Sequence, residues 1–358
     1  MRLRDISDFT SGAALLTLLY ALGCGVLAQL LHIPLPWMVG PLLGIAGAKL
    51  FGKTTESTRS GRLLGQLILG SAIGLHFTQS AVVVMRDMMG LMLVCSFMTL
   101  VVAGLSAHYI RRSTNLSFTT GFFASVPGGA SEMVILGEKY GAAVDFVAVS
   151  QSVRMMAVVV LLPPLFLWSG IAGPMSSSVE SIAFSLPGLL ALAGFCAGAG
   201  LLLQWVKAPA PFMLGPLLTS AALTASGHAL SSIPSFIVSG GQLLIGVALG
   251  SRMDRAFMLG APRLMGAAAG AIGINMLLSA GIALAAAASV HAPVTTLLLA
   301  TAPGGIAEMS LTAKLLNSSV AIVSAFHLTR LLVILTLTSP IFAFGRYCHG
   351  RYVVRKKG

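Results

Sequence analysis

Long apolar stretches run through this 358-residue chain and leave little room for charged side chains. Only 9% of the residues are charged and 56% are hydrophobic, whereas soluble domains carry about 25% charged residues. A bilayer core of about 30 Å thickness requires roughly 20 apolar residues in each helix that crosses it. The sequence therefore predicts an all-α polytopic membrane protein whose main partner is the lipid bilayer.

The chain also contains an internal duplication. ASVPGGASEM at residues 124–133 recurs as ATAPGGIAEM at residues 300–309. AQLLHIPLPWMVGPLL at 28–43 recurs as LQWVKAPAPFMLGPLL at 203–218, and GQLILGSAIG at 65–74 recurs as GQLLIGVALG at 241–250. The spacing between the copies is nearly constant. We therefore divide the chain into a first membrane repeat, residues 1–175, and a second membrane repeat, residues 176–358.

Each repeat is expected to hold about five transmembrane helices and one re-entrant hairpin. The expected spans lie near residues 12–31, 35–51, 63–78, 88–110 and 145–168, and then near 183–205, 212–227, 236–251, 264–287 and 318–344. The Pro-Gly-Gly segments, about 116–140 and 293–316, remain as the hairpins. Because five is an odd number of crossings, the two repeats would be inverted relative to each other.

The distribution of basic residues favours the inverted arrangement. It places most of the 22 Lys and Arg residues on one side, as the positive-inside rule expects of the cytoplasm. If the Pro-Gly-Gly segments crossed the membrane completely, Lys207 and the group Arg252, Arg255 and Arg263 would lie outside. We therefore expect a multi-pass protein of the cell's inner membrane with both termini in the cytoplasm. Membrane anchoring explains these basic residues better than direct binding of nucleic acid does.

Each Pro-Gly-Gly segment is expected to build half of a site near the middle of the membrane. Proline lacks a backbone donor and glycine permits unusual backbone angles, so both end a helix. Irregular backbone at this depth requires surrounding protein or a water-filled cavity, and the half-helix that follows each break offers free N–H groups to an anion. The two breaks consist of Pro127, Gly128 and Gly129 and of Pro303, Gly304 and Gly305.

Two glutamates and two arginines accompany the breaks at matching positions in the two copies. For Glu132 and Glu308, two roles stay open: capping of the helix start and a proton or cation site. For Arg154 and Arg330, a structural ion pair with the glutamate of the same copy stands against a fork for an anionic ligand. All four residues join the six residues of the breaks as candidate substrate-binding residues. His327, which matches Gln151 of the first copy, joins both glutamates as a candidate for proton handling.

Neither a metal site nor a cofactor is indicated by the other reactive side chains. The 7 histidines are scattered along the chain and the 4 cysteines are far apart, without the spacing of metal ligands. We propose no catalytic residue from this sequence. The chain is not expected to be an enzyme.

The chain resembles the duplicated AbrB-family integral membrane proteins over nearly its whole length. The resemblance rests on the two PGG-x-x-E-M blocks, on PWMVGPLLG and PFMLGPLLT, and on the spans that contain arginine. Members of that family have been labelled ammonia monooxygenases or regulators of AidB expression, and the soluble AbrB DNA-binding regulators have a different fold.

We expect a secondary transporter or exporter of a small, anionic organic solute, because inverted repeats supply the two equivalent states that alternating access requires. The alternative is a membrane sensor that changes gene expression indirectly, through a partner. A membrane enzyme of the monooxygenase type is disfavoured, because oxygen chemistry needs converging metal ligands. Assembly into a homo-oligomer is compatible with each of these functions.

Overall fold

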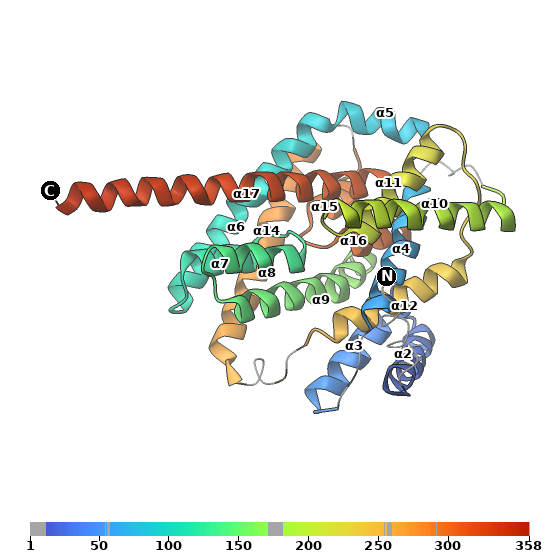
Figure 1. The fold of residues 1–358 in the computed structure, drawn as a ribbon, viewed down its shortest axis with the longest axis horizontal. Helices are drawn as coiled ribbons and strands as arrows, with labels where there is room; N and C mark the ends of the chain where they lie inside the picture. The colour runs from blue at the N-terminus through green and yellow to red at the C-terminus, as the bar shows by residue number, and fades with distance from the viewer. Residues whose placement is uncertain are drawn as a thin grey trace.

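The computed structural model describes residues 12–53, 55, 58–170, 182–253, 255, 260–290 and 292–357, with side chains placed up to residue 342. All regular structure in these ranges is helical (Figure 1), which confirms the all-α class. The helices of the first half are α2 (Gly12–Leu30), α3 (Pro36–Leu50), α4 (Arg59–Gly74), α5 (Gln79–Asp87), α6 (Met89–Ser113), α7 (Phe118–Ser125), α8 (Ala130–Lys139) and α9 (Val144–Trp168). Those of the second half are α10 (Leu186–Trp205), α11 (Pro211–Ala225), α12 (Ser235–Gly250), α14 (Pro262–Ser289), α15 (Val294–Thr301), α16 (Ile306–Leu315) and α17 (Val320–Lys357).

Each of the ten expected spans coincides with a helix, but the helices are of two kinds. Six are long and apolar enough to cross a membrane: α2, α6, α9, α10, α14 and the part Val320–Phe342 of α17. The chain is therefore a multi-pass membrane protein. The other four, α3, α4, α11 and α12, have only 15 or 16 residues. These four helices lie at the expected spans 35–51, 63–78, 212–227 and 236–251, which were themselves only 16 or 17 residues long.

The four short helices pack across the two halves in a reciprocal way. Helix α3 lies on α12, and α4 lies on α11. A Cβ atom on Gly74 would lie 2.5 Å from the carbonyl oxygen of Leu217, and one on Gly250 would lie 2.6 Å from that of Leu42. Reciprocal contacts of this kind are made by two copies related by a two-fold rotation. How that axis lies in the membrane, and with it the inversion of the repeats, stays a prediction.

The duplicated blocks also share unusual backbone angles. His32 and Lys207 occupy matching positions and have φ angles of 54° and 56°, in the left-handed region. Leu35 and Ala210, each directly before a short helix, have φ angles of 51° and 42°. Residues other than glycine adopt such angles infrequently. Both copies therefore make the same sharp entry into their short helix.

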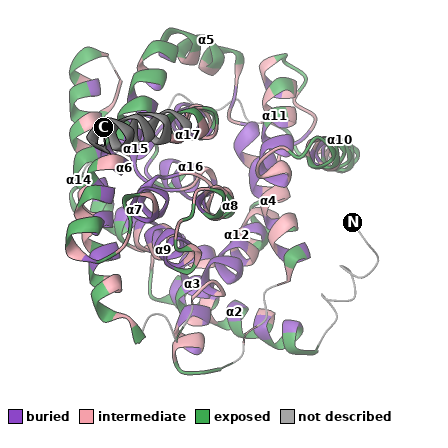
Figure 2. Ribbon diagram, turned by 60° about the vertical axis from the view of Figure 1, so that its left-hand side comes forward, coloured by how far each residue is buried: buried purple, intermediate pink, exposed green. Residues whose placement is uncertain are grey.

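Burial separates an inner set of helices from an outer set (Figure 2). Most residues of α2 and α10 are exposed, and in α10 only Leu192, Cys196 and Gly200 are buried. Because these two helices are apolar along their whole length, lipid is the expected surrounding of their exposed faces. The larger hydrophobic core joins α3, α4, α9, α11, α12, α16 and α17. This core packs around the second Pro-Gly-Gly segment, while Val126 and Met133 beside the first belong to a second, smaller core.

One helix was not anticipated from the sequence. Helix α5 follows α4 after a bend of 87°, and none of its nine residues is buried. Arg86 and Asp87 at its end are exposed, as are Val82, Val83 and Val84. It links α4 to α6 along the outside of the protein (Figure 1).

Candidate functional site

The two Pro-Gly-Gly segments break the chain in the same way. In the first copy α7 ends at Ser125 and α8 begins at Ala130. In the second copy α15 ends at Thr301 and α16 begins at Ile306. The short helices have 8 and 10 residues in both copies, so none reaches the roughly 20 residues of a full crossing. The predicted helix breaks are therefore present at the predicted residues.

The structure explains why each break contains two glycines and why Glu-Met follows after two further residues. In the first copy, a Cβ atom on Gly128 would lie 2.7 Å from Cε of Met133. A Cβ atom on Gly129 would collide with carboxylate oxygen Oε2 of Glu132. The methionine covers the first glycine and the glutamate folds back over the second, where any larger residue would overlap with them.

The second copy repeats this arrangement. A Cβ atom on Gly304 would lie 2.7 Å from Cγ of Met309, and one on Gly305 would collide with Oε2 of Glu308. Both glutamates thus lie over the start of their own helix, where a carboxylate interacts favourably with the positive end of the helix dipole. This geometry agrees with the capping role considered for Glu132 and Glu308.

The two buried arginines bind backbone carbonyls at the end of the preceding short helix. Nη1 of Arg154 donates to the carbonyl oxygen of Val126 at 2.9 Å and to that of Ser125 at 3.4 Å. Nη1 of Arg330 donates to the carbonyl oxygen of Ala302 and Nη2 to that of Gly304, both at 2.6 Å. The two side chains are only 2% and 5% exposed, so their charges are placed deep inside the protein.

The ion pair expected within each copy does not form among the described residues. Carbonyl groups in the last turn of a helix have no donor within the helix and carry the negative end of its dipole. A guanidinium group offers several N–H donors that suit these carbonyls. Arg154 and Arg330 therefore hold the C-terminal side of each break, and the glutamates hold its N-terminal side.

The residues one turn before the arginines differ between the copies. Nε2 of Gln151 donates to the carbonyl oxygens of Phe123 at 2.7 Å and Val126 at 3.0 Å. His327 is buried and approaches the backbone of Ala300, but neither ring nitrogen reaches hydrogen-bond geometry. Among the described residues, the first break is thus held by an amide as well as an arginine, while the matching His327 gives the second break no comparable pair of hydrogen bonds.

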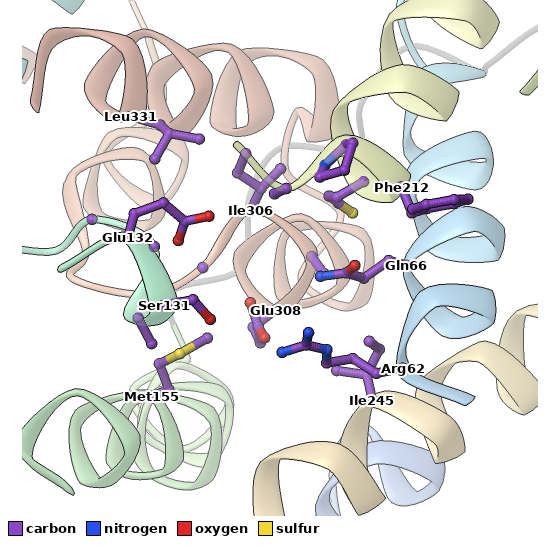
Figure 3. Close-up of a pocket in the computed structure, with 18 of the residues that line it drawn as sticks. Arg62, Gln66, Ser131, Glu132, Met155, Phe212, Ile245, Ile306, Glu308 and Leu331 are labelled. Atoms are coloured by element: carbon purple, nitrogen blue, oxygen red, sulfur yellow. The ribbon is translucent and has the colours of Figure 1, made fainter. Parts of the chain in front are cut away.

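One cavity of about 410 Å³ brings the predicted site residues together (Figure 3). Of the ten candidate substrate-binding residues, all except Pro303 line it, and His327 lines it as well. In Figure 3, Glu132 and Glu308 point into the same space, and Arg62 and Gln66 reach toward Glu308 from α4. The lining residues from the two breaks are Pro127, Gly128, Gly129, Glu132 and Arg154, and Gly304, Gly305, Glu308 and Arg330.

Four further basic residues line the cavity and were not assigned to the site from the sequence. Arg59 and Arg62 belong to the first turns of α4, Lys207 follows α10, and Arg252 follows α12. All four were placed on the cytoplasmic side by the positive-inside rule. That rule indicated that these residues lie on the same side of the membrane. It did not indicate that they line the same cavity.

The described residues that line the cavity include six Lys or Arg residues and two glutamates. Arg252 interacts electrostatically with Arg62, Glu308 and Glu132. Arg154 interacts with Glu308 of the other copy and with Arg330. Within the described ranges, no three His, Cys, Asp or Glu side chains are grouped as metal ligands. The cavity therefore suits an anion.

The two breaks are unequally exposed. Glu308 is 4% exposed, while Glu132 is half-buried. Ala307 is buried, whereas Ser131 at the matching position is exposed. The first break is therefore the more accessible of the two, and the exposed side chains of Arg59 and Lys207 mark where the cavity reaches the surface.

Comparison with known proteins gives the family. The family model described as "Transition state regulatory protein AbrB" matches residues 37–345. The chain belongs to the AbrB family. This AbrB-family chain is 28% identical over 327 residues to "Putative regulator AbrB" of Escherichia coli (strain K12), covering 90% of the chain and 92% of that protein. It is 27% identical over 364 residues to "Uncharacterized protein YhjN" of Bacillus subtilis (strain 168), covering 91% of each. No solved structure matches the chain.

Proposed function

We propose that this AbrB-family chain is a secondary transporter of a small organic anion in the cell's inner membrane, with both termini in the cytoplasm. The observation that supports this most is the single cavity that contains both helix breaks and is open mainly around the first. In a duplicated protein, exchange of the roles of the two halves would close this opening and create its counterpart around the second break. Such an exchange is alternating access.

In this mechanism the arginines keep the breaks intact while the halves move. Arg154 and Arg330 bind the carbonyls that each break leaves without helical partners. These contacts lie within one copy, so each hairpin and its arginine-containing helix can move as a unit. The interfaces that must rearrange are those between the halves.

The two glutamates are the proposed proton carriers. Ionised Glu132 and Glu308 place negative charge in a cavity that would otherwise attract an anion strongly. Protonation of either glutamate removes that charge and favours binding of the solute, so proton and anion would cross together. His327, buried beside Arg330 in the cavity wall, is a further candidate for moving the proton.

The second candidate is a membrane sensor that regulates gene expression indirectly. It is favoured by the name "Putative regulator AbrB" of the relative from Escherichia coli. A sensor would bind the solute in the same cavity without moving it across the membrane. We propose no enzymatic activity.

Reconstitution of the purified protein separates these functions. Small organic anions are screened for thermal stabilisation, and those that bind are tested for uptake into proteoliposomes with and without a pH gradient. A transporter should show uptake that the pH gradient drives and that Gly305→Leu abolishes, because leucine cannot fit beneath Glu308. Gly104→Leu in α6 is the control, because nothing lies within 4 Å of its Cβ position. An anion that binds but is never taken up would rule out transport and favour the sensor.

A further inference from the structure

We propose that Arg62, Lys207 and Arg252 at the cavity opening bind the charged groups of the solute, and that the solute is an anion with at least two negative charges. This inference deepens the proposed function, because it rests on the cavity being the solute site. The sequence instead predicted that the anion binds at the starts of the half-helices after each break and at the buried Arg154 and Arg330.

The buried arginines already use part of their hydrogen-bonding capacity to hold the breaks. Both Nη atoms of Arg330 bind backbone carbonyls, and so does Nη1 of Arg154. The Nε atoms of both residues are buried and have no hydrogen-bond partner among the described residues. A forked contact with a carboxylate or phosphate needs two parallel N–H groups of one guanidinium. The carbonyls of the break hold both Nη atoms of Arg330 in place, so this guanidinium is not free to turn toward an incoming anion.

The starts of α8 and α16 are likewise occupied. A helix start attracts an anion through its free N–H groups and the positive end of its dipole. Here the carboxylates of Glu132 and Glu308 already lie over Gly129 and Gly305. The protein's own anions therefore stand where the solute was expected.

The guanidinium groups at the opening are better placed for an incoming anion. Arg62 and Arg252 are half-buried, line the cavity, and are close enough for their positive charges to interact. Like charges that approach one another in a partly desolvated position repel, and an anion between them relieves that repulsion. Lys207 adds a third cation, which is exposed at the same opening.

The charge balance indicates the valence of the solute. Among the described lining residues, six side chains are Lys or Arg and two are Glu. A solute with one negative charge would leave most of the net positive charge of these side chains uncompensated. Each further negative charge on the solute would be attracted to the remaining positive charge of the cavity. The cavity volume of about 410 Å³ lies within the usual range for sites of small organic molecules.

Binding of succinate and butyrate to the purified full-length protein tests the proposal. These anions have the same number of carbon atoms, but only succinate carries two negative charges near neutral pH. Citrate extends the series to three. Calorimetric titration at constant ionic strength should give succinate a Kd lower than that of butyrate by about tenfold or more, as expected for one additional charged hydrogen bond. Equal affinity for the two anions, or no binding of either succinate or citrate, would overturn the proposal.

Variants locate the binding residues. Arg62→Gln and Arg252→Gln should each weaken succinate binding by about tenfold or more, and Arg62→Lys should restore only part of the loss because lysine lacks the fork. Arg111→Gln is the matched control, because Arg111 is exposed at the end of α6 and does not line the cavity. An equal loss in Arg111→Gln would attribute the effect to general surface charge and contradict the proposal.

The two proposals fail in different ways. If succinate binds as expected but does not enter proteoliposomes, transport is wrong and the binding site stands. If another solute is taken up equally well by the normal protein and by the Arg62→Gln and Arg252→Gln variants, the binding site is wrong and transport stands.

Discussion

At the scale of single residues, the Pro-Gly-Gly-x-x-Glu-Met sequence is a packing unit. Gly129→Ala places a methyl group against the carboxylate of Glu132. Because this carboxylate is the end of a flexible side chain and can swing aside, we expect a loss of about 1 kcal/mol, at the low end of the usual cost of overpacking. Thermal unfolding in detergent measures the effect.

A double variant identifies the cause of that loss. In Gly129→Ala with Glu132→Ala the collision is removed, so part of the stability should return. Gly104→Ala in α6 is the control, because its Cβ position is open and alanine suits a helix better than glycine does. If Gly104→Ala were as harmful as Gly129→Ala, the packing explanation would be wrong.

The two buried arginines should contribute unequally to stability. Arg330 makes two hydrogen bonds of 2.6 Å, while Arg154 makes one of 2.9 Å and one of 3.4 Å. Hydrogen bonds to charged groups contribute about 1.5–3 kcal/mol each, so Arg330→Gln should lower the melting temperature more than Arg154→Gln does. Equal shifts would show that the carbonyl contacts do not determine the stability of the breaks.

The residues of the site were predicted better than their contacts were. Proline and glycine end a helix through their own backbone chemistry, so the breaks at Pro127 and Pro303 could be located from the sequence. The partner of Arg154 could not, because equal spacing of charges in two copies does not distinguish a carboxylate from a backbone carbonyl. The role of Arg62 at the opening depends on how α4, α10 and α12 meet, which local sequence does not encode.

At the scale of helices, close packing of the short helices joins the two halves. Gly250→Ala would place a methyl group 2.6 Å from the carbonyl oxygen of Leu42, and a backbone carbonyl cannot turn aside as a side chain does. We expect a loss of about 1–3 kcal/mol, measured by thermal unfolding. Gly240→Ala, in the first turns of the same helix α12, has nothing within 4 Å of its Cβ position and should have little effect. A large loss in Gly240→Ala would contradict this account.

The helices show which patterns the sequence carries strongly. Long apolar helices such as α6 and α14 were predicted within a few residues, because hydrophobicity alone identifies them. Helix α5 was missed, since its nine residues include polar ends and lie between two apolar stretches. Helices α3 and α12, expected near residues 35–51 and 236–251, have 15 and 16 residues, so their short length could be read from the sequence.

At the scale of the whole molecule, the inverted arrangement predicts the side on which each loop lies. Ser232, between α11 and α12, should be outside, and Lys53, after α3, should be in the cytoplasm. Single cysteines at these positions, in a chain without its 4 native cysteines, are labelled in intact cells by a reagent that cannot cross the membrane. Label should reach Ser232→Cys and not Lys53→Cys. Labelling of both from the same side would contradict the inversion.

The basic opening of the cavity has a counterpart with different chemistry. Lys207 corresponds to His32, which has the same unusual backbone angle. Arg252 corresponds to His76, each two residues after its copy of the duplicated block at 65–74 and 241–250. If the halves exchange roles as proposed, two permanent cations at the inner opening would be replaced by two imidazoles at the outer one. An imidazole is not a permanent cation as lysine and arginine are, so the solute would be bound more tightly at the inner opening than at the outer one. The proton gradient would still set the net direction of movement, while this difference between the two openings would make the affinity for the solute unequal on the two sides.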